Sequence, residues 1–155
     1  MKEILDFTAQ FKATINLNEK LVVKRKKRYF LLNENLKSHL HEDYYYIGIY
    51  LGKTKEGRFF PSFNLLTMMA RGRARKIVVD RKTEWLFICG RDIFKRGILR
   101  TTDSMRKGDY TLVVNQHGEC LGFGRLLCNV DEEVDRQKVI VRNISDVGDF
   151  LRRER

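Results

Sequence analysis

Residues 85–125, WLFICGRDIFKRGILRTTDSMRKGDYTLVVNQHGECLGFGR, decide the fold of this chain. The apolar run WLFIC predicts a buried strand that Gly90 breaks, and residues 92–95 are expected to form a helical turn. Two apolar runs follow, 110–114 and 119–127, and the loop NQHG between them is typical of a β-hairpin in which the glycine takes a positive φ. The stretch therefore predicts a strand, a short helical turn and a hairpin.

The chain after this stretch continues the same pattern. Residues 131–137, DEEVDRQ, read as an acidic loop, and residues 139–141 as a strand. Ser145 is expected to cap a closing helix, because a serine hydroxyl accepts a bond from the free N–H groups of a first helical turn. Short strands outnumber helices and show no βαβ alternation, so the sequence predicts an α+β fold with antiparallel or mixed sheets.

The first half alternates helices and strands in the same way. Asn33 and Ser62 are placed to cap helices, and Gly72 to end the second of them. The aromatic run YYYIGIYL predicts a strand. The expected elements are a helix over 2–13, strands at 21–23 and 29–32, a helix from 34 to about 40, strands at 44–51 and 59–60 around a turn at 52–58, a helix after Ser62, and a strand at 76–79.

These features together resemble a known family. The order of elements in 85–125 resembles a PUA domain, a module that binds RNA. The tail ECLGFGR (119–125) with KVIVRNISDVGDFLRRE (138–154) resembles the Nip-seven family of large-subunit (60S) ribosome biogenesis factors. Residues 44–80 are similar to that family's domain before the PUA domain. The segment before Tyr29 matches poorly, which indicates an archaeal-type member.

The resemblance implies two small domains and a role without catalysis. Residues 1–83 would form an N-terminal α/β domain with an antiparallel sheet, and 84–155 a C-terminal PUA pseudobarrel, with the boundary in DRKTE (80–84). The family role is RNA binding in large-subunit assembly and pre-rRNA processing. The expected partners are RNA, as single-stranded or structured pre-rRNA, and ribosome-assembly or exosome-type proteins. The protein is expected to be a cytoplasmic monomer, or nuclear or nucleolar if its source is eukaryotic.

The charge of the chain favours a polyanionic partner. Its net charge is +11. Residues 1–83 hold 18 Lys and Arg against 8 Asp and Glu, whereas 84–155 hold 13 against 12, so the excess lies in the first half. Long-range attraction of RNA is therefore expected to come mainly from that half. No apolar run approaches the roughly 20 residues that span a bilayer.

Basic residues of the PUA half are the first candidates for RNA contact. An arginine fork donates two parallel bonds to a phosphate. The alternatives are cations that complement the dipole of the last helix, and a solvated helix face with Asp92 paired to Arg96. The candidates are Arg91, Lys95, Arg96, Arg100, Arg142, Arg152, Arg153 and Arg155.

Two basic clusters in the first half form a second candidate patch. An RNA track is weighed against charged turns, lysines that protect a sheet edge, and, for the first cluster, a nuclear localisation signal. The neighbouring tyrosines, Tyr44 to Tyr46, either stack bases or pack against the sheet. The clusters are Lys24, Arg25, Lys26, Lys27 and Arg28, and Arg71, Arg73 and Arg75 with Lys76.

Other chemistries are not expected. The three cysteines, Cys89, Cys120 and Cys128, lie in apolar strand-like contexts and show no metal-ligand spacing. The cluster His39, His41, Glu42 and Asp43 lacks a further ligand, so it reads as a solvated helix end. The glycines of LGFG read as strand glycines because no helix follows them. No cofactor and no enzyme activity are expected, and the main alternative function is a protein–protein adaptor.

Overall fold

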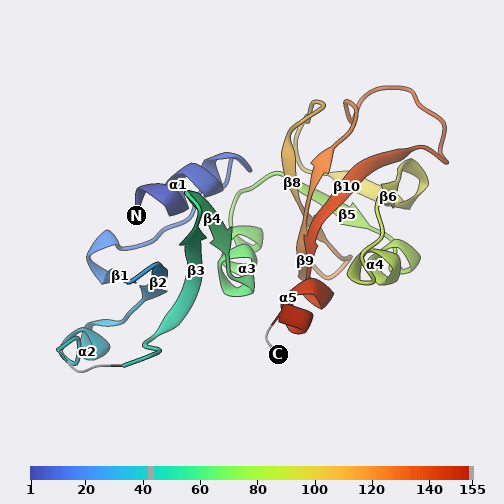
Figure 1. The fold of residues 1–155 in the computed structure, drawn as a ribbon. Helices are drawn as coiled ribbons and strands as arrows, with labels where there is room; N and C mark the ends of the chain where they lie inside the picture. Colours follow the sequence, from blue (N-terminus) through green and yellow to red (C-terminus); the bar gives the residue numbers. More distant parts are fainter. Residues whose placement is uncertain (42–43, 154–155) are drawn as a thin grey trace.

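The computed structural model describes residues 1–41 and 44–153 (Figure 1). Its first half contains one antiparallel sheet of order β1-β2-β3-β4, with α1 and α3 packed on it. The elements are α1 (Lys2–Ala9), the 3-10 helix η1 (Glu19–Leu21), β1 (Val22–Arg25), β2 (Arg28–Leu31), α2 (Glu34–Lys37), β3 (Ile49–Lys55), β4 (Arg58–Pro61) and α3 (Phe63–Arg71).

The second half is a strongly curved sheet of order β6-β10-β9-β8-β5-β7, close to a closed barrel. Its pairs are antiparallel except β5 with β8, which are parallel. This α+β architecture confirms the expected fold class. The elements are β5 (Lys76–Val79), α4 (Arg81–Ile88), β6 (Ile93–Phe94), the 3-10 helix η2 (Lys95–Gly97), β7 (Ile98–Thr101), β8 (Tyr110–Val114), β9 (Cys120–Leu126), β10 (Val139–Asp146) and α5 (Val147–Arg153).

One hydrophobic core joins the two halves. Phe7 of α1 and Phe11, just after that helix, pack edge-on against Phe123 of β9, with ring centroids 5.9 and 5.6 Å apart. Helix α3 lies between the sheets and contacts both β3 and β9, as Figure 1 shows. Aromatic pairs of this kind add about 0.5–1.5 kcal/mol each beyond the area they bury. The two sheets are therefore fixed relative to each other.

Several local predictions are confirmed. Ser62 Oγ accepts a bond from Leu65 N and Asn33 Oδ1 one from Leu36 N, so both residues cap helices. The hairpin β8–β9 forms with Gly118 at φ +80°. In the strand that follows, Gly122 has φ +143° and lies against the backbone of Ser145, where a Cβ would collide. The LGFG glycines are thus strand glycines at an irregularity, as expected.

The tyrosine run is not a strand, which corrects the prediction. Pairing with β2 begins only at Ile49 and continues to Lys53, so β3 occupies most of the segment that was expected to be a turn. Gly48, at φ +72°, sits against the carbonyl of Leu31 and ends the irregular segment. Tyr44 to Tyr46 are 40–77% exposed. The β-propensity of these tyrosines is not realised, because β2 pairs with residues 49–53 and gives the tyrosines no partner strand.

The run WLFIC is a helix, not a buried strand. Asp80 accepts a bond from Thr83 N and caps α4, so residues 80–84 are the start of that helix and not a linker. Trp85 is 65% exposed while Phe87 is buried. Because β5 pairs with β7 and β8, the second sheet begins before residue 84. We propose that the domains divide between α3 and β5.

Smaller differences occur at the ends of elements. Helix α1 ends at Ala9, well before the expected residue 13. Ile93 and Phe94, expected in a helical turn, form strand β6, and the helical turn comes after them as η2. Strand β10 runs on to Asp146, so Ser145 lies in a strand and Asp146 accepts the bond from Asp149 N at the start of α5. Cys89 is exposed, unlike the buried Cys120 and Cys128.

Candidate nucleic-acid interface

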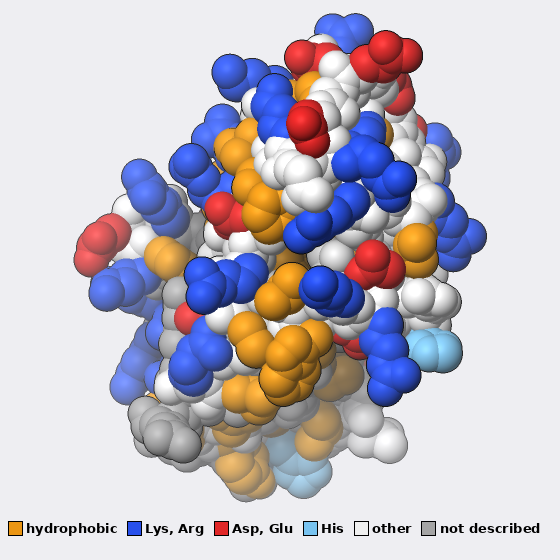
Figure 2. Space-filling view, turned by 90° about the vertical axis from the view of Figure 1, so that its right-hand side faces the viewer, with side chains coloured by type: hydrophobic (Ala, Val, Ile, Leu, Met, Phe, Trp, Pro, Cys, Tyr) orange, Lys and Arg blue, Asp and Glu red, His pale blue; other side chains and the backbone are white. Residues whose placement is uncertain are grey.

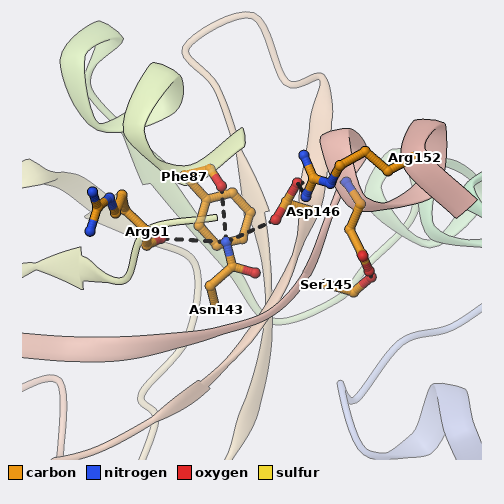
Figure 3. Close-up of polar contacts among 7 residues, drawn as sticks. Phe87, Arg91, Asn143, Ser145, Asp146 and Arg152 are labelled. Carbon is orange, nitrogen blue, oxygen red and sulfur yellow. Dashed lines mark hydrogen bonds and ion pairs between the residues drawn. The ribbon is translucent and has the colours of Figure 1, made fainter. Parts of the chain in front are cut away.

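Asn143 holds together the elements on which the PUA-half candidates lie. Its Nδ2 donates to the carbonyl of Phe87 at 2.9 Å and to that of Arg91 at 3.4 Å, and to Asp146 Oδ2 at 3.2 Å (Figure 3). Its backbone N–H donates to Asp92 Oδ1 at 2.8 Å. One asparagine thus connects the end of α4, the loop after it and the start of α5.

Arg91 and Arg152 lie on either side of this network. Arg152 Nη2 is 3.7 Å from Asp146 Oδ1, and its side chain is 61% exposed whereas that of Asp146 is almost buried. Figure 3 shows the Arg152 guanidinium beside Asp146 and Arg91 on the other side of Asn143. Gly148 allows the approach of α5 to α4, since a Cβ there would meet the carbonyl of Ile88. Because the Arg152 side chain is largely exposed although Asp146 is not, its guanidinium stays accessible to a phosphate.

Lys95 and Arg96 have structural partners in the loop before β10. Lys95 Nζ donates to the carbonyl of Val130 at 2.7 Å, and Arg96 Nη1 donates to Gln137 Oε1 at 2.7 Å. The pair of Asp92 with Arg96, weighed as the alternative to RNA contact, is replaced by these contacts, because Asp92 accepts from the backbone N–H of Asn143. Lys95 therefore holds the loop before β10 in place. The exposed Arg96 lies beside the acidic residues of that loop, 131–137.

Arg142 lies on the opposite side of β10 from Asn143, because successive strand residues face opposite ways. It is directly across from Arg125 of β9, which in turn is across from Tyr110 of β8. The Arg125 guanidinium lies over the Tyr110 ring at 5.7 Å, and its Nε donates to the carbonyl of Gly108. Two exposed arginines next to an aromatic ring form a cross-strand row, a like-charge pairing that favours an anionic ligand.

The other PUA-half candidates are placed separately. Arg100 is exposed on β7, Arg153 is the last residue of α5, and Arg155 lies outside the described residues. Figure 2 shows Lys and Arg side chains spread around hydrophobic ones on this side of the molecule, with acidic side chains at the top, where Figure 1 places the loop before β10. The candidates thus form separate groups and not one patch.

The second basic cluster of the first half is largely used inside the fold. Arg75 is only 11% exposed and forms an ion pair with Asp109 at 3.1 Å. Lys76 Nζ donates to the carbonyls of Ala70 and Gly72, where its charge complements the end of α3. Arg71 and Arg73 are exposed. Only these two arginines of the cluster are available to an external ligand.

The first basic cluster lies across a hairpin and lines a groove of about 790 Å³. Lys24 is excluded from it, because its Nζ turns to Glu3 of α1 at 3.2 Å. The groove, called the N-terminal groove below, is lined by Arg25, Lys26, Lys27, Arg28, Phe30, Tyr44, Tyr45, Lys53, Thr54 and Lys55.

Comparison with known proteins identifies the second half. Residues 75–155 match the family described as "UPF0113 PUA domain". The chain belongs to this family. A UPF0113 protein of Archaeoglobus fulgidus is 29% identical over 113 residues, which are 72% of this chain and 64% of that protein. The zebrafish (Danio rerio) 60S ribosome subunit biogenesis protein NIP7 homolog is 30% identical over 111 residues, 70% of this chain and 62% of that protein.

Among solved structures, a conserved PUA domain protein from Thermoplasma acidophilum is similar to this UPF0113 PUA-domain protein. The match covers 99% of the present chain and 94% of the Thermoplasma chain. The TM-score is 0.65 at 24% identity, which supports the fold. The chain spans a little under two thirds of the length of the curated relatives it matches. The resemblance to the Nip-seven family and to a PUA domain is confirmed.

The structure adds site residues to this UPF0113 PUA-domain protein that the sequence did not single out. Arg125 ends the quoted LGFGR motif, and the K-x-K alternation of Lys53 and Lys55 was available as a signal for one strand face. Their roles depend on strand register, which the sequence does not display. No described group of three His, Cys, Asp or Glu side chains suits a metal, and Glu42 and Asp43 of the weighed cluster lie outside the described residues. None of the described helices is both long and apolar enough to cross a bilayer.

Proposed function

We propose that this protein binds RNA through its PUA half and acts, without catalysing a reaction, in assembly of the large ribosomal subunit and in pre-rRNA processing. The observation that carries the proposal is membership of the UPF0113 PUA domain family, with relatives named as 60S ribosome subunit biogenesis proteins. Such a role would place the protein inside the cell, where ribosomal RNA is assembled.

The contact surface we propose is the row of Arg125 and Arg142, and Arg91 and Arg152, around Asn143 on the other side of β10, form a second and separate group. The two row residues are exposed and directly opposite each other, so their repulsion is relieved when a phosphate lies between them. The Tyr110 ring lies beneath the Arg125 guanidinium and helps to hold that arginine in place. The basic first half supplies long-range attraction.

The test is a salt series of RNA binding with the full chain. The probes are a uridine-rich single strand and a structured rRNA fragment. For a single strand, the log–log slope changes by about 0.7 for each phosphate that the protein no longer neutralises. We expect Arg125→Ala/Arg142→Ala to weaken binding and to flatten the slope by about 1.4.

The matched control removes two exposed lysines of the first half, Lys2→Ala/Lys20→Ala. It removes the same charge, so it separates a local contact from a general reduction in positive charge. Equal weakening in both double variants would contradict a contact at the arginine row. An absence of binding by the unaltered chain at moderate salt would contradict direct RNA recognition and favour an adaptor that meets acidic proteins.

A further inference from the structure

The N-terminal groove is formed by strands whose basic side chains are held in register. Arg25 is directly across from Arg28, and Arg28 is directly across from Lys53. Like charges opposite each other on adjacent strands destabilise a sheet by a few tenths of a kcal/mol or more per pair. Lys26 and Lys27 continue the charge around the turn, and all four groove lysines, these two with Lys53 and Lys55, are exposed.

No described lining residue of the groove is acidic. The carboxylate of Glu56 is 3.9 Å from Lys55 Nζ at the rim, where both side chains are at least two-thirds exposed. One exposed pair does not neutralise the six cations of the lining. The groove therefore concentrates positive potential in a concave space, which attracts an anion more strongly than a flat surface does.

An aromatic side chain is presented over this charge. Tyr45 is 77% exposed, and the Arg28 guanidinium stacks beneath its ring at 4.7 Å. A hydrogen bond to Tyr45 raises the pKa of Arg28 further above its ordinary value, so the guanidinium stays charged. Arg25 Nη1 donates to the carbonyl of Tyr44 at 2.6 Å and so positions the segment that carries Tyr45. Phe30, buried, supports the groove from the sheet.

We propose that the N-terminal groove binds single-stranded nucleic acid, with phosphates held by its lysines and Arg28 and one base stacked on Tyr45. Any base can stack on an aromatic ring, and any phosphate can bind a cation. The combination therefore suits a single strand without sequence preference. A volume of about 790 Å³ is in the range that accommodates a nucleotide-sized ligand. An acidic peptide would use the cations but not an exposed ring.

That the strand is RNA rests on the function proposed above. Figure 1 shows the groove hairpin β1–β2 on the far side of β3 and β4 from β8, β9 and β10, the strands that carry the arginine row. The groove is thus a contact separate from the arginine row of the PUA half. A longer strand would engage both, and its affinity would then exceed that of either contact alone.

The test compares Tyr45→Ala, Tyr45→Phe and Lys53→Ala/Lys55→Ala in the full chain, by fluorescence anisotropy of a labelled uridine-rich oligonucleotide of about 12 nucleotides. Base–aromatic stacking contributes about 1–3 kcal/mol per base, so we expect Tyr45→Ala to weaken binding about 5- to 150-fold. Tyr45→Phe keeps the ring and is expected to stay within about twofold. The lysine variant is expected to flatten the salt slope by about 1.4.

Each outcome decides one proposal. If Tyr45→Ala binds like the unaltered chain, base stacking in the groove is wrong. If, in addition, a poly-glutamate peptide displaces the oligonucleotide from the groove, the groove is a site for acidic proteins. Loss of binding in Arg125→Ala/Arg142→Ala alone supports the PUA contact and overturns the groove. Loss in the groove variants alone does the reverse. The deoxy oligonucleotide of the same sequence should show the same effect of Tyr45→Ala, because neither stacking nor phosphate contact needs a 2′-hydroxyl.

Discussion

Substitution of Asn143 tests whether one side chain fixes the PUA half. Asn143→Ala removes the Nδ2 bonds to the Phe87 carbonyl (2.9 Å) and to Asp146 Oδ2 (3.2 Å). A neutral acceptor contributes about 1 kcal/mol net and a charged one about 1.5–3 kcal/mol. Phe87 keeps the bond from Gly90 N and Asp146 keeps that from Asp149 N. We therefore expect the free energy of unfolding to fall by about 2–3 kcal/mol.

Asn143→Asp should be worse, although it has nearly the same shape. It removes both donors and places a second carboxylate beside Asp146, which is 3% exposed. Two close carboxylates raise the pKa of one of them, so we expect at least about 1 kcal/mol of further loss at pH 7. This loss of stability depends on pH. It is fully present above the raised pKa and becomes smaller as the pH falls below that pKa, because one of the two carboxyls then takes up a proton.

Urea unfolding followed by far-UV circular dichroism measures these free energies by linear extrapolation. Asn129→Ala is the matched control, because that asparagine is exposed and its side chain accepts one bond from Lys107 N. Its cost should stay below about 1 kcal/mol. If Asn143→Asp were as stable as the unaltered chain at pH 7, the network would not hold these elements together.

Three further predictions follow from the fold. A chain of residues 84–155 lacks β5, which lies between β7 and β8 in the sheet, so we expect no cooperative unfolding transition from it, in contrast with the full chain. Burial raises the pKa of the Cys120 thiol to about 11, so iodoacetamide at pH 8 should modify the exposed Cys89 first, as peptide mass spectrometry would show; equal labelling would argue against this packing. The neighbouring Tyr29 hydroxyl and Lys24 ammonium lower the pKa of the Glu3 carboxyl to about 2. Its stabilising effect is complete above its unfolded pKa near 4.5 and disappears as the pH falls through about 2. NMR titration should therefore find a midpoint near 2 in the unaltered chain, and in Lys24→Ala a midpoint raised only part of the way toward 4.5, because the Tyr29 hydroxyl remains.

The elements that the sequence predicts well are those governed by local chemistry. The caps at Asn33 and Ser62 and the hairpin glycine at Gly118 need only their neighbours, and all three are as expected. The PUA domain is recognisable from the order of its motifs. Local chemistry also misleads: WLFIC is apolar enough for a strand, yet the cap at Asp80 makes it a helix with Trp85 outside.

The candidate sites depend on register, which local patterns do not reveal. Arg125 meets Arg142, and Arg28 meets Lys53, only because particular strands pair at particular residues. The KRKKR run resembles one patch in the sequence, but alternation sends Lys24 to α1 and the others to the groove. Arg75 resembles part of a surface track, whereas its ion pair with Asp109 makes it internal.

The most direct test of RNA contact through the PUA half is photo-crosslinking of the full chain to a uridine-rich RNA that carries 4-thiouridine, followed by peptide mapping. We predict crosslinked peptides from β8, β9 and β10, around Tyr110, Arg125 and Arg142, and their disappearance in Arg125→Ala/Arg142→Ala. Crosslinks confined to residues 1–75, with none in the second sheet, would contradict the account.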